Sequence, residues 1–251
     1  MNLSKAVLTA EMSQKVYDDY AGIEAWMRDN GYDNWAWFDA DGTQAFTCRK
    51  HKSTEIFIVF RGTEPNQMKD ILADVKAWRK PAREKGLVHF GFAQALDKVY
   101  DKIVHWIDEQ KLDDAKIICT GHSLGAALAT ICASRLDAHE LYTFGSPRVG
   151  NRAFVKEMKN DNITHYRFVN NNDIVTKVPF PIRFVHHGSL VYINHYGNIR
   201  RMTPWQRFKD SWRGRARAFA KGQPFDGIFD HSVSLYYEKI KNVSESVSSQ
   251  N

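Results

Sequence analysis

The sequence has little cysteine. Only three of its 251 residues are cysteine, Cys48, Cys119 and Cys132. Three thiols cannot close a disulfide framework, so we expect free thiols buried in the core, as in a reducing compartment. A chain of this length can bury roughly 70–75% of the surface that it exposes when unfolded, and therefore needs no covalent cross-links. This composition excludes the small disulfide-stabilised folds.

The sequence also has no long apolar run. No stretch of about 18 consecutive apolar residues occurs, so we expect no helix that spans a membrane. The opening residues Met-Asn-Leu-Ser-Lys lack the basic start and the apolar stretch of a secretory signal. We therefore expect a cytoplasmic protein, with export by a signal-independent route as the alternative.

Strand-like and helix-like segments alternate along the chain. Short apolar, β-branched runs predict strands at 35–39, 44–48, 55–60, 116–120, 140–144 and 163–169. Helical spacing predicts helices at 9–30, 91–110, 123–136 and 201–221, and a hairpin is expected at 183–194. This order predicts an α/β fold with a mainly parallel sheet and helices on both faces. We expect residues 1–241 to form a single domain and the polar, serine-rich residues 242–251 to be a disordered tail.

Ser123 is the candidate nucleophile. It lies at the centre of Gly121-His122-Ser123-Leu124-Gly125, directly after a predicted buried strand and directly before an alanine-rich predicted helix. This strand–turn–helix setting is what a nucleophile elbow requires, since flanking glycines remove side chains that would collide across the sharp turn. The N-terminus of the helix would also favour the negative charge that develops during acyl transfer.

A nucleophilic serine needs a general base and an acid that orients the base. Asp173 is the candidate acid, because it follows a predicted strand on an asparagine-rich loop. His231 is the candidate base, immediately before an amphipathic helix at the end of the chain. On chain order alone three other histidines after Asp173 remain alternatives: His186, His187 and His195. No histidine group has the spacing of a metal site, so we expect neither a metal nor a cofactor.

The chain resembles the class 3 lipases, a fungal-lipase-like branch of the α/β-hydrolases. Six runs carry the resemblance in the order of the family: Val59-Phe60-Arg61-Gly62-Thr63, Val88-His89-Phe90-Gly91-Phe92, residues 121–129, Phe144-Gly145-Ser146-Pro147-Arg148-Val149-Gly150, Asn172-Asp173-Ile174-Val175 and Asp230-His231-Ser232. They extend over residues 56–240. The resemblance implies an α/β-hydrolase fold and a carboxyl-ester hydrolase that acts on lipid esters.

The resemblance also assigns roles to residues. It implies that Ser123, His231 and Asp173 form a catalytic triad, and that Thr63 and Leu124 form the oxyanion hole. His89 matches a structural histidine of the family. Residues 64–86 occupy the place of the family's lid, although a plain surface helix fits their sequence equally well.

One segment holds the positive charge of the chain. The net charge is +6, and residues 199–222 contain eight Lys and Arg but one acid, Asp210. Within residues 200–221 a single helical stripe combines four aromatic side chains and an alanine: Trp205, Phe208, Trp212, Ala216 and Phe219. An aromatic stripe flanked by cations is typical of a helix at an anionic membrane surface. The alternative is that the stripe packs on the domain; no recognition motif supports nucleic-acid binding.

Two other functions fit the same motifs. An acyltransferase or thioesterase would use the same triad, and a catalytically silent membrane-binding module could keep the fold. The motifs are shared by hydrolases of triacylglycerols, phospholipids and galactolipids, so the sequence leaves the lipid class and the oligomeric state open.

Overall fold

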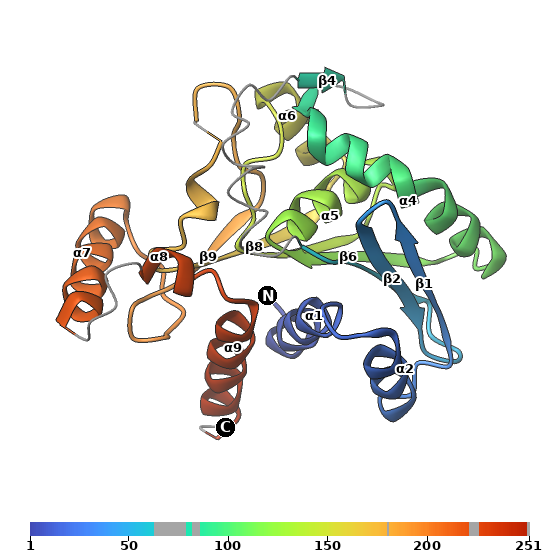
Figure 1. The fold of residues 1–251 in the computed structure, drawn as a ribbon, viewed down its shortest axis with the longest axis horizontal. Helices are drawn as coiled ribbons and strands as arrows, with labels where there is room; N and C mark the ends of the chain where they lie inside the picture. Colours follow the sequence, from blue (N-terminus) through green and yellow to red (C-terminus); the bar gives the residue numbers. More distant parts are fainter. Residues whose placement is uncertain (63–78, 82–85, 180, 221–225, 250–251) are drawn as a thin grey trace.

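The computed structural model describes residues 1–62, 79–81, 86–179, 181–220 and 226–249. Its centre is a seven-stranded sheet with the strand order β1-β2-β3-β6-β7-β8-β9 (Figure 1). The strands are β1 (Asn34–Ala40), β2 (Thr43–Arg49), β3 (Glu55–Phe60), β6 (Lys116–His122), β7 (Glu140–Phe144), β8 (Thr164–Asn170) and β9 (Ser189–Ile193). From β3 to β9 all neighbours are parallel, whereas β1 and β2 are antiparallel. The expected mainly parallel α/β architecture is confirmed.

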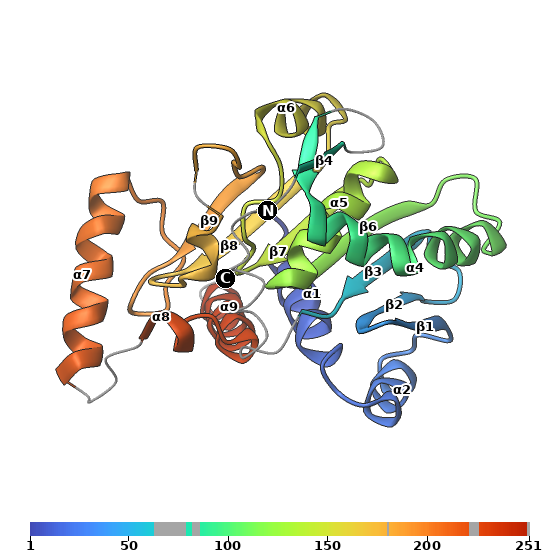
Figure 2. The same cartoon turned by 45° about the horizontal axis from the view of Figure 1, so that its top comes forward.

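Helices cover both faces of the sheet (Figure 2). One face packs against α4 (Phe90–Glu109), α5 (Leu124–Arg135) and α6 (Arg152–Asn160). The other packs against α1 (Leu3–Lys15), α2 (Tyr20–Asp29) and α9 (Val233–Ser248). Strand β3 shows why the central strands are continuously apolar: Ile56 and Ile58 enter the first core, and Phe57 and Val59 enter the second.

The remaining elements lie at the edges of these layers. They are the short strands β4 (Arg79–Pro81) and β5 (Leu87–His89), the 3₁₀ turn Val175–Lys177, α7 (Pro204–Ala220) and α8 (Asp226–Phe229). Strands β4 and β5 form a separate two-stranded sheet. No helix in the described part of the chain combines the length and the apolarity needed to cross a bilayer. The three cysteines are buried free thiols, as predicted.

Two expectations about helices and strands are corrected. The single helix expected at 9–30 is two helices, because Asp19 caps a new helix by accepting a hydrogen bond from the backbone N–H of Gly22. The hairpin expected at 183–194 is absent. Its first half instead bonds to another loop, where the backbone N–H of Val185 donates to the carbonyl of Gly150 at 2.8 Å. The second half is β9, which pairs in parallel with β8.

The C-terminal segment also differs from the expectation. Helix α9 continues to Ser248 and so includes most of residues 242–251, which were expected to be a disordered tail. Serine hydroxyls in this last part donate hydrogen bonds back to helix carbonyls, as from Ser246 to Val243 at 2.8 Å and from Ser248 to Ser244 at 3.0 Å. These local bonds are compatible with a helix, so a serine-rich composition alone did not indicate disorder.

Candidate active site

Ser123 lies at a strained turn between β6 and α5. Its backbone angles, φ 60° and ψ −126°, are rarely adopted by residues with a side chain. The flanking glycines are sterically required, because a Cβ on Gly121 would lie 2.5 Å from the carbonyl of Gly125, and one on Gly125 would lie 2.2 Å from the carbonyl oxygen of Phe60. The backbone N–H of Ser123 donates to Phe144 at 2.9 Å. The sharp strand–turn–helix geometry predicted around Ser123 is therefore present.

Of the two residues expected to form the oxyanion hole, Leu124 is among the described residues and Thr63 is not. Leu124 is the first residue of α5, so its N–H lies at the positive end of that helix beside Ser123. Thr63 lies outside the described residues, as do residues 64–78 and 82–85 of the expected lid. Gly62 is described, and a Cβ on it would lie 2.7 Å from the carbonyl oxygen of His122 and 3.2 Å from Cβ of Ser123. The chain that leads to Thr63 therefore passes directly against the candidate nucleophile.

Asp173 and His231, 58 residues apart in sequence, form a hydrogen-bonded pair. The Nδ1 atom of His231 lies 3.0 Å from Oδ1 and 2.9 Å from Oδ2 of Asp173. The carboxylate is completely buried and accepts two further bonds, from the backbone N–H of Val175 at 2.9 Å and from the hydroxyl of Tyr236 at 2.6 Å. Because a carboxylate accepts hydrogen bonds from the ring, Nδ1 of His231 carries a proton and Nε2 is left as the basic atom.

Gly145 brings this pair beside the elbow. Its neighbour Phe144 accepts the hydrogen bond from Ser123, and its own φ is +62°. A Cβ on Gly145 would lie 2.8 Å from Oδ2 of Asp173 and 2.9 Å from Nδ1 of His231. The absence of a side chain at this position lets the acid and the base approach the end of β7.

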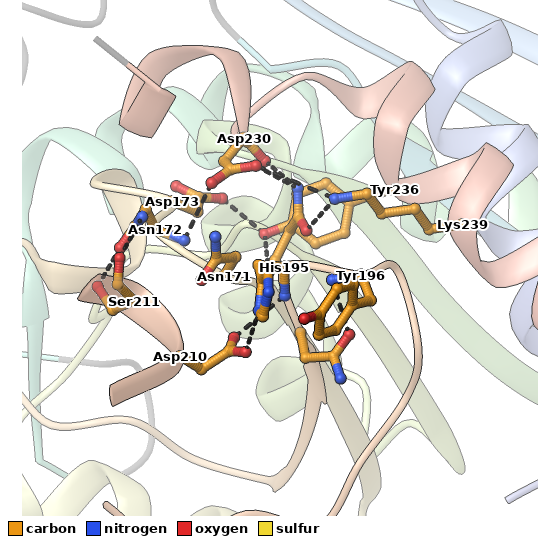
Figure 3. A network of polar contacts seen from close by, with 12 residues as sticks. Asn171, Asn172, Asp173, His195, Tyr196, Asp210, Ser211, Asp230, Tyr236 and Lys239 are labelled. Carbon is orange, nitrogen blue, oxygen red and sulfur yellow. Dashed lines mark hydrogen bonds and ion pairs between the residues drawn. The ribbon is translucent and has the colours of Figure 1, made fainter. Parts of the chain in front are cut away.

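Hydrogen bonds join the loop that carries Asp173 to the segment that carries Asp230 and His231 (Figure 3). Asp230 accepts hydrogen bonds from the backbone N–H of Asn172 at 3.1 Å and from the side chain of Asn170. Lys239 donates to Oδ1 of Asn170 at 2.7 Å, and its ammonium lies 4.0 Å from Asp230. These contacts fix the position of the acid relative to the base, and none of them was predicted from the sequence.

His122 supports the base from the opposite side. Its Nε2 lies 2.6 Å from the carbonyl oxygen of His231, and the two rings are 4.5 Å apart. Since a carbonyl oxygen can only accept a hydrogen bond, Nε2 of His122 is the donor to it. Nδ1 of His122 then accepts a hydrogen bond from the hydroxyl of Tyr17 at 3.0 Å. Burial and the neighbouring His231 lower the pKa of His122 well below its usual value, so it stays neutral.

The three alternative bases are held by other partners. Nε2 of His186 bonds to the carbonyl of Thr176 at 2.8 Å, and Nδ1 of His187 lies 3.0 Å from Nδ1 of His165. His195 is bonded to the carboxylate of Asp210. By contrast, Nε2 of His231 is buried and has no hydrogen-bond partner among the described residues. The geometry thus favours His231, whose free nitrogen could accept a proton from a neighbouring hydroxyl.

Metal binding finds no support in the described ranges. No group of three or more His, Cys, Asp or Glu side chains capable of holding an ion occurs there. Together the described groups form an acid, a base and a strained serine at the carboxyl end of a parallel sheet, which is the arrangement of acyl-transfer sites in α/β-hydrolases.

Comparison with known proteins agrees with this geometry. Residues 57–182 match the family model described as Lipase (class 3). The lipase of Rhizomucor miehei is 33% identical over 165 residues, which are 60% of this chain and 45% of that protein. The lipase of Rhizopus niveus is 29% identical over 204 residues, covering 75% and 50% respectively. The chain thus spans about half the length of the curated relatives that it matches.

Solved structures extend the similarity to the fold. Lipase II from Rhizopus niveus superimposes with a TM-score of 0.64 at 25% identity and covers 76% of this chain and 80% of that one. A triacylglycerol lipase described as having a serine protease triad at its catalytic centre gives a TM-score of 0.62 at 26% identity, with the same coverage. The family and the α/β-hydrolase fold indicated by the sequence motifs are confirmed, and the chain belongs to the class 3 lipases.

Proposed function

We propose that this protein is a serine carboxyl-ester hydrolase that acts on lipid esters, with Ser123 as nucleophile, His231 as general base and Asp173 as the acid that orients His231. One observation carries the proposal: the buried pair of Asp173 and His231, joined at 2.9 Å, lies beside a serine held at φ 60°. The membership in the class 3 lipases supports the substrate class.

The proposed reaction has two halves. Oγ of Ser123 attacks the acyl carbonyl carbon while Nε2 of His231 takes the hydroxyl proton, and the same proton then passes to the departing alcohol as the ester C–O bond breaks. Water next attacks the acyl-enzyme, giving a proton to His231, and the fatty acid leaves as Ser123 recovers its proton. Asp173 remains ionised and stabilises the imidazolium in both halves.

The oxyanion would be held by backbone donors. We assign the N–H of Leu124 and the N–H and hydroxyl of Thr63 to this role. In other enzymes, loss of one such donor costs roughly 3–4 kcal/mol of transition-state stabilisation. No cofactor is required by this mechanism.

We further propose that α7 makes peripheral contact with anionic membranes. The aromatic side chains of the stripe keep much of their surface open to solvent, since Trp205, Phe208, Trp212 and Phe219 are between 52% and 76% exposed. Arginines and lysines flank the stripe on the same helix. An exposed apolar stripe between cations fits a helix that lies in the interface of an anionic bilayer.

Replacement of Ser123 by Ala tests the hydrolase proposal. We expect hydrolysis of p-nitrophenyl butyrate to be lost, whereas Ser232→Ala, at an exposed position beside His231, should retain it. Full activity of Ser123→Ala would contradict the proposal. Transfer of the acyl group to added alcohols in preference to water would favour an acyltransferase. Hydrolysis of acyl thioesters alone would favour a thioesterase. A panel of triacylglycerol, phospholipid and galactolipid substrates would identify the lipid class.

A further inference from the structure

A cationic cleft lies between α7 and the β8–β9 edge of the central sheet. Its volume is about 410 Å³. Val169 and Tyr192, paired neighbours on β8 and β9, form part of its floor, and Phe208 and Trp212 of α7 form part of its wall. The cleft also reaches Asn171, two residues before Asp173. It is therefore built from several elements rather than from one helix.

The charged side chains of this cleft all have the same sign. Five cationic residues line it, contributed by two strand-end loops, β8 and α7: Arg148, Arg167, Lys177, Arg207 and Arg215. None of the described residues that line it is Asp or Glu. The one acid of α7, Asp210, is buried and accepts hydrogen bonds from the backbone N–H of His195 at 3.1 Å and from the hydroxyl of Tyr192 at 3.0 Å. It thus anchors α7 to β9 without forming an ion pair with these cations.

Arg167 is the deepest of these cations. Its Nε is buried and has no hydrogen-bond partner among the described residues. It forms no ion pair with any described acid. Burial lowers the pKa of Arg167 to about 10, and the nearby charges of Arg207 and Arg148 add to this effect. A partly buried cation without a counter-charge is unfavourable, so this guanidinium would be stabilised by an anion in the cleft.

The other arginines surround the same space. Arg148 is held in place by a hydrogen bond from Nη1 to the carbonyl of Pro179 at 2.7 Å and by another to the carbonyl of Lys177. Arg207 and Arg215 are two turns apart on α7 and have no ion-pair partner among the residues that the structure describes. A ligand in the cleft could thus be contacted from the sheet, the loops and the helix at once.

We propose that this cleft is a binding site for a phosphate ester. A phosphate monoester carries about −1.5 to −2 charges and three strong acceptor oxygens, whereas a carboxylate carries one charge and two oxygens. Guanidinium groups bind phosphate oxygens in pairs of parallel hydrogen bonds. The phosphate can belong to a soluble ester or to a lipid head group, and both sources share this chemistry. This site is separate from the ester-cleaving site and does not depend on hydrolysis.

Direct binding measurements test the proposal. The Ser123→Ala protein would be titrated calorimetrically with inorganic phosphate and with glycerol 3-phosphate, and its binding to phosphatidylcholine vesicles with and without phosphatidic acid would be measured by flotation. The cleft variant is Arg207→Gln/Arg215→Gln. The charge-matched control is Arg213→Gln/Arg217→Gln, whose two exposed arginines lie on the same helix but do not line the cleft. Circular dichroism would establish that both variants fold.

We expect the cleft variant to weaken binding of the soluble phosphate ester at least tenfold and the control to weaken it less than twofold. Both pairs of arginines lie on the helix that we propose to contact membranes, so both variants should lose affinity for vesicles, and the cleft variant should lose more. Saturable binding of glycerol 3-phosphate that shows this difference supports the site and assigns it to soluble esters. Binding only to vesicles that contain phosphatidic acid, with the larger loss in the cleft variant, supports the site and assigns it to a lipid head group. Absence of binding in both assays, or an equal loss in both variants, would overturn the proposal.

Discussion

The hydroxyl of Tyr236 donates a 2.6 Å hydrogen bond to Oδ2 of Asp173, the candidate catalytic acid. The same hydroxyl accepts the backbone N–H of Asn170 at 2.9 Å, and Tyr236 is completely buried in α9. Tyr236 therefore links the helix that follows His231 to the loop that carries Asp173. We regard it as a positioning residue for the acid–base pair.

Replacement of Tyr236 by Phe should lower kcat roughly tenfold with little change in KM, because the carboxylate loses a donor that fixes its orientation. The orphaned N–H of Asn170 should also reduce the free energy of unfolding by about 1–3 kcal/mol. Kinetics on a p-nitrophenyl ester and urea denaturation measure the two effects. Tyr237→Phe, one position along the helix, is the control and should change neither; equal kinetics for both variants would refute the positioning role.

Gly145→Ala should impair catalysis far more than it impairs stability. The new Cβ would lie 2.8 Å from Oδ2 of Asp173 and would displace the acid–base pair, so we expect kcat to fall about a hundredfold. Gly42→Ala is a matched control, because Gly42 also has a positive φ, +79°, but has no atom within 4 Å of an added Cβ. Both variants incur a backbone penalty of about 1–2 kcal/mol. Similar kinetics for the two would contradict the proposed geometry.

Stability should decrease as the pH falls below 6.5. Burial lowers the pKa of His187 to about 4, and it also lowers the pKa of its hydrogen-bonded neighbour His165 well below the usual value. Between pH 6.5 and 4 the unfolded chain therefore binds more protons than the folded one, and the free energy of unfolding drops. His187 alone should contribute a loss of about 2 kcal/mol by pH 5. Urea denaturation at pH 7 and pH 5 checks this, and a constant free energy would contradict it.

Removal of single exposed aromatics from α7 should weaken binding to anionic vesicles. Trp205 and Phe219 lie outside the cationic cleft, so Trp205→Ser and Phe219→Ser test the membrane contact alone. We expect a loss of about fivefold for each, since partial burial of an aromatic side chain contributes about 1 kcal/mol. Tyr20→Ser on α2 should have no effect. Equal binding of the unaltered protein to anionic and zwitterionic vesicles would argue against this contact.

Local patterns in the sequence were sufficient to predict the central strands and the elbow. Strand β3 coincides with its predicted run 55–60, and the elbow follows from a buried strand, two glycines and an alanine-rich helix. The helix α6 was not predicted, although Asn151 caps it and Phe154, Val155 and Met158 form its buried face. The cap and the apolar spacing of a helix are both present, but α6 has only nine residues, and so short a segment gives a weak periodic pattern.

The supporting contacts of the site could not be predicted in the same way. Tyr236 and Asp173 are 63 residues apart, and Asp230 and Asn172 are 58 residues apart. Such pairs are brought together by the packing of α9 against the sheet. A periodic pattern of apolar residues within one segment does not indicate them. The prediction of a hairpin at 183–194 was wrong for the same reason. The pairing of β9 with β8 depends on the position of a strand outside that segment.

Covalent labelling of Ser123 tests the central claim most directly. A fluorophosphonate reacts only with a serine that a neighbouring base activates, and it adds a phosphonyl group that mass spectrometry can locate. We predict modification at Ser123 in the unaltered protein, a strong reduction in His231→Gln, and none in Ser123→Ala. Labelling at another serine, or equal labelling of Ser123 in His231→Gln, would contradict the account of Ser123 as a nucleophile activated by His231.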